Sequence, residues 1–218
     1  LTNLTISNAA TAYTVLFTDA ALAATDNAIT VTGDNVTGAV AVNLNVGTAG
    51  ASAYETVNVV SNGTVINAFN LASNGSDYTT LNVSGASAFT TVNASANLTA
   101  FNAATATGNI TYTAGGEAVA TYTGGDGDDV ITLTGTYTVA DTVNGGDGTD
   151  RLGITNALAV AVAVNQTNVS NIEVIGLTDG LNGSVNINQF GAAGATASGI
   201  RFGAAMAGVG TVNFAAGT

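Results

Sequence analysis

The sequence contains no cysteine, proline, histidine, tryptophan or lysine. Without cysteine no disulfide can stabilise the chain, and metal ions are another route by which an exported protein is stabilised. The only two basic residues, Arg151 and Arg201, cannot form the clusters that bind nucleic-acid phosphates or anionic membrane surfaces. The longest apolar run, Ala157–Val164, falls far short of the roughly 18 residues of a membrane helix. We therefore expect no nucleic-acid partner and no membrane insertion.

The 218 residues carry a formal net charge of −12, so divalent cations are the natural partners of this chain. It begins with leucine and shows no signal peptide, which indicates a segment of a longer polypeptide whose export signal or anchor lies elsewhere. Only 7% of the residues are charged, while Thr, Val, Asn, Ala and Gly dominate. Thr and Val favour strands, and Asn and Gly favour turns. This composition predicts an all-β fold.

Short triplets with a central asparagine recur through the first half of the chain. The steps between successive asparagines are too short for βαβ units, which need about 30 residues, but they suit a β-solenoid or a meander of hairpins. Asn62-Gly63 and Asn74-Gly75 are candidate hairpin turns. We favour the parallel β-solenoid, or β-helix, because stacked coils would align the asparagines in a hydrogen-bonded ladder. The triplets are Leu44–Val46, Val57–Val59, Phe69–Leu71, Leu81–Val83, Val92–Ala94 and Phe101–Ala103.

Two nearly matching segments, Gly124–Ile131 (GGDGDDVI) and Gly145–Leu152 (GGDGTDRL), fit the nonapeptide G-G-x-G-x-D-x-U-x, in which U is a large aliphatic residue. In this motif a glycine-rich turn binds calcium and the x-U-x piece forms a short strand. A solvated acidic loop is the alternative interpretation. Like charges about 4 Å apart repel by roughly 4 kcal/mol at an effective dielectric near 20, so stacking two such loops favours a cation between them.

Partial copies extend this pattern on both sides. Gly115-Gly116 precedes the first full copy by nine residues, and Asp141 precedes Asp150 by nine. A three-residue insertion near Gly135 would explain why the full copies lie 21 rather than 18 residues apart. We expect three regions: solenoid repeats over 1–112, a calcium-binding β-roll over 113–153, and a terminal β-solenoid segment over 154–218.

The full copies resemble the RTX repeats of exported bacterial proteins, which implies an RTX calcium β-roll embedded in the solenoid. The resemblance implies that one turn supplies the carbonyls of its first and third positions and its aspartate. The next turn on that side supplies the carbonyls of its second and fourth positions and its own aspartate. The implied Ca²⁺ ligands are Gly124, Asp126, Asp129, Gly146, Gly148 and Asp150, and an ion on the opposite side would depend on Asp141 and Glu117.

The Thr- and Asn-rich surroundings over about 54–175 resemble RTX-type bacterial surface-layer (S-layer) proteins. This resemblance implies a structural protein exported by a type I system that self-associates into a calcium-dependent lattice on the bacterial cell surface. A cell-surface polysaccharide is a second partner to consider. Toxins and proteases of the superfamily carry recognisable catalytic or acylated regions, and the proteases also need a histidine-rich zinc motif, whereas this chain has no histidine.

Three other functions use the same fold. An RTX adhesin or extracellular fibre stalk needs the same calcium-loaded rod. An ice-binding face is suggested by T-x-T strands such as Thr111–Thr113, although their spacing is irregular. A polysaccharide lyase or epimerase needs a base and cations near the uronate, for which only Arg151, Arg201 and the tyrosines are present. We therefore expect a non-enzymatic structural role.

Overall fold

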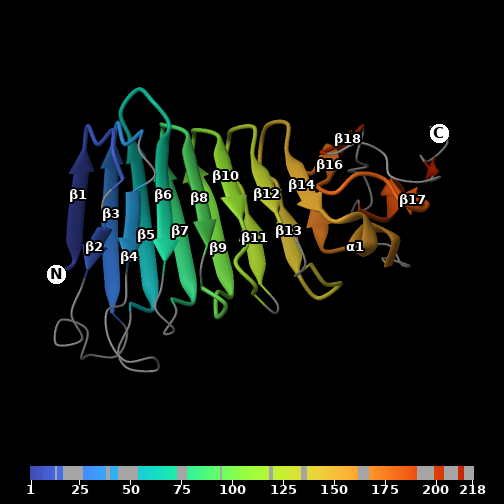
Figure 1. Ribbon diagram of the computed structural model, residues 1–218, viewed down its shortest axis with the longest axis horizontal. Helices are drawn as coiled ribbons and strands as arrows, with labels where there is room; N and C mark the ends of the chain where they lie inside the picture. Colours follow the sequence, from blue (N-terminus) through green and yellow to red (C-terminus); the bar gives the residue numbers. More distant parts are fainter. Residues whose placement is uncertain are drawn as a thin grey trace.

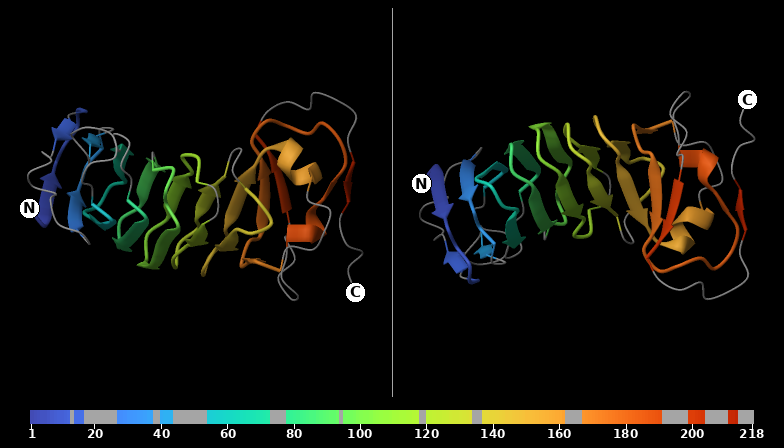
Figure 2. Two further views of the ribbon diagram at one scale, coloured as in Figure 1. Left: turned by 90° about the horizontal axis from the view of Figure 1, so that it is seen from below. Right: turned by 90° about the horizontal axis from the view of Figure 1, so that it is seen from above.

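The computed structural model describes residues 1–12, 14–16, 27–37, 40–43, 54–72, 78–93, 95–117, 120–133, 137–161, 167–190, 199–203 and 211–213. It confirms the predicted parallel β-solenoid. Successive strands alternate between two sheets, and every described strand pair is parallel. Figures 1 and 2 show the strands stacked along one axis, with the two termini at opposite ends.

The strands form two main sheets and one short pair. The eight-stranded sheet contains β1 (Asn3–Ser7), β3 (Ala28–Asp34), β5 (Thr56–Asn62), β7 (Thr80–Gly85), β9 (Ala100–Ala106), β11 (Thr121–Thr123), β13 (Thr142–Asn144) and β15 (Val169–Ser170). The nine-stranded sheet contains β2 (Thr14–Leu16), β4 (Val40–Asn43), β6 (Asn67–Ala72), β8 (Phe89–Asn93), β10 (Ile110–Thr113), β12 (Val130–Thr132), β14 (Arg151–Ile154), β16 (Val174–Leu177) and β18 (Gly199–Phe202). The remaining two strands, β17 (Val185–Asn186) and β19 (Val212–Asn213), pair with each other.

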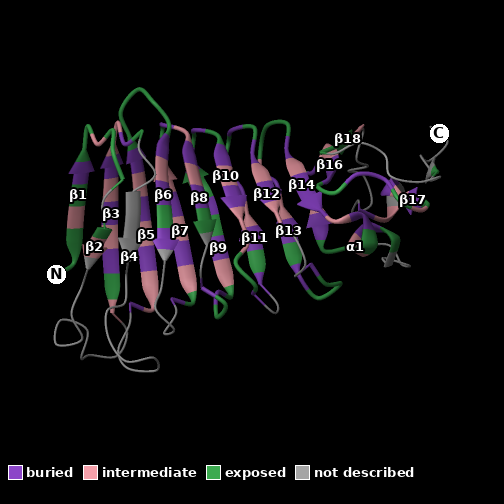
Figure 3. Cartoon of the chain, in the orientation of Figure 1, coloured by how far each residue is buried: buried purple, intermediate pink, exposed green. Residues whose placement is uncertain are grey.

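The core lies between the two sheets because side chains alternate across each strand. In β5, Val57 and Val59 are buried while Asn58 between them is half-buried. The same alternation runs along the other long strands as bands of buried and more exposed residues (Figure 3). In the middle of the stack, Phe101 and Tyr112 reach across from opposite sheets and stack with ring centroids 4.3 Å apart.

Among the described strands, the asparagines of the repeated triplets align on one sheet only. Asn58, Asn82 and Asn102 are in register on β5, β7 and β9, and the Asn82 Nδ2 donates to the Asn58 Oδ1 at 2.8 Å. On the other sheet the register differs by one residue, so Asn70 of β6 pairs with Val92 rather than with Asn93. Successive triplets therefore lie on alternate sheets, and whether their asparagines align depends on the register within each sheet.

The hairpin alternative fails at Asn62-Gly63, since β5 and β6 on either side of it belong to different sheets. The other candidate turn, Asn74-Gly75, and the triplet Leu44–Val46 lie outside the described residues. So does the position near Gly135 at which we expected an insertion. The two motif strands nevertheless pair 21 residues apart, with Val130 opposite Arg151.

Past β14 the stack includes helical turns where the sequence suggested only strands. The α-helix α1 (Asn156–Ala161) follows β14, and a 3₁₀ helix, η2 (Ile187–Phe190), follows β17. Thr155 caps α1, because its Oγ1 accepts a hydrogen bond from the Leu158 amide at 3.3 Å. Ala and Leu, which have high helix propensity, make up most of α1. Together with the Thr155 cap they favour a helix over a strand, although α1 also contains one valine.

Candidate metal centre

The two glycine-aspartate loops lie directly above one another in successive coils. The first, residues 124–129, joins β11 to β12, and the second, residues 145–150, joins β13 to β14. The Gly124 amide donates to the Asn144 carbonyl at 2.8 Å, and the Asp147 amide donates to the Gly125 carbonyl at 2.9 Å. The structure thus brings together the loops that contain Gly124, Asp126, Asp129, Gly146, Gly148 and Asp150, as their spacing predicts.

Close backbone packing explains the glycines of these loops. A Cβ at Gly124 would overlap the carbonyl oxygen of Gly145, and one at Gly146 would overlap that of Gly125. Gly146 also has a φ of +102°, which L side chains rarely adopt. Glycine is therefore required here for coil-to-coil contact, whatever the loops bind.

Asp129 closes the first loop through hydrogen bonds to both of its carboxylate oxygens. Its Oδ1 accepts from the Ile110 amide of the preceding coil at 2.7 Å, and its Oδ2 accepts from the Gly125 amide at 2.6 Å. Burial raises the pKa of Asp129, these amide hydrogen bonds oppose the rise, and the neighbouring Asp128 and Asp126 add to it. The carboxylate is buried but fully hydrogen-bonded.

Asp150 occupies the equivalent position in the second loop, yet only one of its oxygens has a partner among the described residues. Its Oδ1 accepts from the Asp129 amide at 2.7 Å, while its Oδ2 is buried without a hydrogen bond. The amide that would match Gly125 is that of Gly146, which donates instead to the Asn144 Oδ1 at 3.2 Å. One buried carboxylate oxygen of the second loop therefore has no hydrogen-bond donor in the part of the chain that the structure describes.

The raised pKa of Asp150 also indicates that its negative charge is poorly stabilised by the surrounding residues. Burial raises its pKa to about 7, and the Asp129 amide opposes this rise. The negative charges of Asp129, Glu173 and Asp128 also contribute to this raised pKa. A buried carboxylate of this kind is stabilised either by a proton or by a bound cation.

The two stacked loops also contain backbone oxygen atoms of the kind that calcium binds. Among the described residues, the carbonyls of Gly124, Asp126, Gly146 and Gly148 accept no hydrogen bond, whereas those of Gly125 and Asp129 do. Calcium takes six to eight oxygen ligands and accepts backbone carbonyls as readily as carboxylates. No group of three or more acidic side chains able to hold a metal occurs in the described ranges, so a cation here would depend mainly on carbonyls. The donor set fits calcium.

Asp141, the seventh candidate ligand, lies apart from this cluster. It precedes β13 and so belongs to the turns on the opposite side of the coil. Its Oδ1 accepts from the Ala120 amide at 2.8 Å and its Oδ2 from the Thr138 amide at 2.6 Å. On the same side, Glu117 is buried, accepts from the Tyr112 hydroxyl and accepts from the Gly115 and Gly116 amides. These contacts give both acids a role in closing turns.

Glu173 belongs to the site, although we did not predict it. Its Oε2 accepts from the Asp150 amide at 2.8 Å, which continues the column formed by Asp129 and Asp150 into the next coil. Each of these acids directly precedes a strand of the nine-stranded sheet. The shared pattern of an acid two residues before a large aliphatic residue, here Glu173-Val174-Ile175, is the signal that could have identified it.

Comparison of the chain with protein-family models, with curated protein sequences and with solved structures returned no match. The fold and the site themselves describe a parallel β-solenoid with a candidate cation site in its two stacked glycine-aspartate loops. Within the described ranges, no helix has the length and apolarity needed to span a membrane.

Proposed function

We propose that the stacked loops bind one calcium ion and that the chain is a calcium-dependent structural segment of a bacterial cell-surface protein. The observation that carries the proposal is the buried Asp150 Oδ2, which lacks a donor among the described residues, in a pair of stacked loops with several carbonyls that accept no hydrogen bond from them. The carbonyls of Gly124, Asp126, Gly146 and Gly148 would hold the ion, together with the carboxylates of Asp129 and Asp150.

Calcium would act here as a folding ligand. It would neutralise part of the negative charge that Asp129, Asp150 and Glu173 bring into one column. Because it binds both loops, it would stabilise the contact between successive coils. Calcium sites of extracellular modules bind with dissociation constants of about 10⁻⁴–10⁻³ M, so such a segment would fold after export, not in the low-calcium cytosol.

Self-association is the second part of the proposal. Within the described strands, β1 and β2 end the two sheets, and each pairs on one side only. Edge strands of this kind pair readily with another segment or another copy. Together with the sequence resemblance to RTX S-layer proteins, this favours a calcium-dependent lattice on the cell surface. An RTX adhesin or fibre stalk is the second candidate, favoured by the elongated stack (Figure 2).

Calcium titration of the chelator-stripped protein tests the metal site. Asp150→Asn should abolish calcium binding, because it removes the charge at the buried oxygen. Asp147→Asn is the matched control: it makes the same charge change in the same loop, but Asp147 is exposed and is not an implied side-chain ligand. We expect wild type and D147N to bind one ion. A wild-type protein that binds no calcium at millimolar concentrations would refute the metal site.

Imaging tests the assembly. Native mass measurement and negative-stain microscopy, each with calcium and with chelator, should show monomers in chelator and a two-dimensional lattice in calcium. Isolated fibres in calcium would favour the stalk. Calcium binding without any assembly would retain the metal site and reject self-association.

A further inference from the structure

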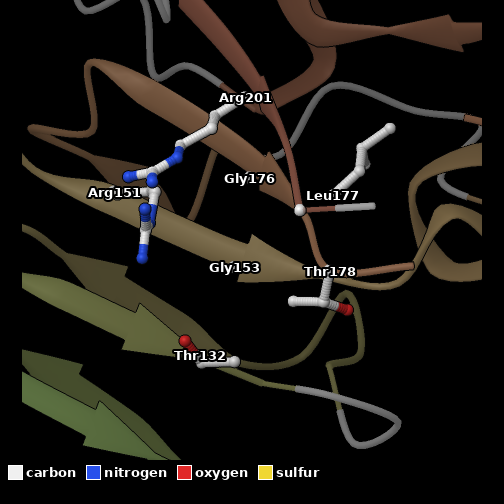
Figure 4. Close-up of a pocket in the computed structure, with 8 residues that line it drawn as sticks. Thr132, Arg151, Gly153, Gly176, Leu177, Thr178 and Arg201 are labelled. Carbon is white, nitrogen blue, oxygen red and sulfur yellow. The ribbon is translucent and has the colours of Figure 1, made fainter. Parts of the chain in front are cut away.

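Both cationic side chains of the protein line one pocket on the outer face of the nine-stranded sheet. The pocket has a volume of about 170 Å³. Figure 4 shows the guanidinium groups of Arg151 and Arg201 side by side at one end of it. The remaining lining residues are Thr132, Gly153, Gly176, Leu177, Thr178 and Gly203.

Strand register brings the two arginines together although they are 50 residues apart in sequence. One row across the sheet runs Thr132, Gly153, Gly176 and Arg201 on β12, β14, β16 and β18. Arg151 lies on β14, two residues before Gly153. A Cβ at Gly176 would be 3.1 Å from the Arg151 Cδ, so this glycine lets the arginine lie across β16 towards Arg201.

No carboxylate neutralises this pair in the part of the chain that the structure describes. Neither guanidinium has an ion pair or a hydrogen bond to any described residue, although the chain contains 14 acidic residues. Arg151 is half-buried, and its pKa is lowered by burial and then by the charge of Arg201. Two like charges crowded together without a counter-charge form a site that an anion would stabilise.

We propose that this pocket binds the carboxylate of an acidic sugar, with Arg151 and Arg201 as the residues that bind the anion. Planar guanidinium groups bind planar carboxylates through paired hydrogen bonds. The Arg151 stem lies against Gly176 and the Thr132 side chain lies against Gly153, so Thr132 and Thr178 bring hydroxyl groups to the lining of the pocket beside the two arginines. Sugar hydroxyls are natural partners for such groups.

The charge of the whole protein favours a small ligand with a single negative charge. At a net charge of −12, the chain repels extended polyanions such as nucleic acids. A uronic acid unit brings one carboxylate and neutral hydroxyls, so it meets the two arginines without a large electrostatic cost.

The ligand pair methyl glucuronide and methyl glucoside tests the proposal, because the two differ at the carboxylate. Calorimetric titration into the calcium-loaded protein should show binding of methyl glucuronide and none of methyl glucoside. Arg151→Gln and Arg201→Gln should each weaken the binding of methyl glucuronide by about tenfold or more, through loss of a charge-assisted hydrogen bond. Thr121→Glu is the control: it makes the same change in net charge from an exposed position on the other sheet.

A trisaccharide of glucuronate distinguishes two possible ligands, a segment of an acidic polysaccharide and a free acidic sugar. Tighter binding than the monomer would assign the pocket to a polysaccharide segment, and equal binding would assign it to a free acidic sugar. The proposal is overturned if wild type does not distinguish the glucuronide from the glucoside, or if R201Q and R151Q bind it as well as T121E does. Self-association lost in R201Q without glucuronide binding would assign the pocket to an acidic side chain of a second copy instead. The calcium titration above is a separate readout, so the two proposals can fail independently.

Discussion

Asp129 and Asp150 occupy the same position in two copies of one motif, but their hydrogen bonding differs. Both oxygens of Asp129 accept backbone amides, whereas the Oδ2 of Asp150 has no donor among the described residues. The difference originates at Gly146, whose amide donates to the side chain of Asn144. The two aspartates should therefore respond differently to the same substitution.

Asp129→Asn should lower the free energy of unfolding by about 1–3 kcal/mol with or without calcium, because one of its two buried amide partners, Ile110 or Gly125, loses its acceptor. Asp150→Asn should leave stability in chelator unchanged or higher, since it removes a buried charge. It should also abolish the stabilisation by calcium. Urea unfolding with calcium and with chelator measures both effects. Equal losses for the two variants in chelator would contradict this assignment.

Stability should depend on pH in opposite ways with and without calcium. Burial raises the pKa of Asp150 from 3.8 to about 7, so the folded state binds this proton more tightly than the unfolded state does. In chelator, stability should be greatest below pH 4 or so and should fall as the pH rises through about 7. Calcium needs the ionised carboxylate, so the stabilisation that it adds should grow over the same range.

Thermal unfolding between pH 4 and 8, with a chelator effective at each pH, measures this dependence. Asp150→Asn should flatten the chelator profile, because the titrating group is gone. A wild-type profile in chelator that rises with pH across this range would show that another group controls stability.

At the scale of elements, the turns are constrained by contact between successive coils. Gly146 and Gly116 both have positive φ, at +102° and +121°. A Cβ at Gly146 would overlap the Gly125 carbonyl, whereas one at Gly116 would meet no atom of the described residues within 4 Å. Substituting alanine at Gly116 therefore measures the cost of backbone strain alone, whereas the same substitution at Gly146 adds the cost of disturbed packing between coils.

Gly116→Ala should cost about 1–3 kcal/mol of unfolding free energy, the usual range for a side chain in such a backbone conformation. Gly146→Ala should cost clearly more, because its coil must also move away from Gly125. Denaturant unfolding of both variants in calcium tests this. Equal losses would mean that the loops tolerate wider spacing than their stacking suggests.

Alternating apolar residues predicted the strands well, as at Val57 and Val59 of β5. The pairing of asparagines was predictable only in part. Asn58 and Asn82 meet across β5 and β7, but Asn70 and Asn93 are out of register by one residue. Strand pattern is a local property, whereas register also depends on the length of the turns between strands.

At the scale of the whole molecule, each coil contacts mainly its neighbours, so stability should vary along the stack. Removing calcium should loosen the coils that contain the two loops and leave distant coils protected. Hydrogen exchange in chelator should therefore speed up over 120–154 before it does over 56–85. Uniform acceleration along the chain would indicate that the stack unfolds as one unit.

Strand alternation, glycine turns and the 21-residue spacing can be seen in the sequence, so the solenoid and the stacking of the two acidic loops could be predicted from it. The folded chain was needed to show which carboxylate oxygen lacks a donor among the described residues, because that depends on the Asn144 side chain accepting from the Gly146 amide. It also decided that Arg151 and Arg201 meet, since their contact depends on the register of three strands from different coils. Spacing along a chain predicts which coils stack, but the partners of single atoms depend on side chains that only the folded chain brings together.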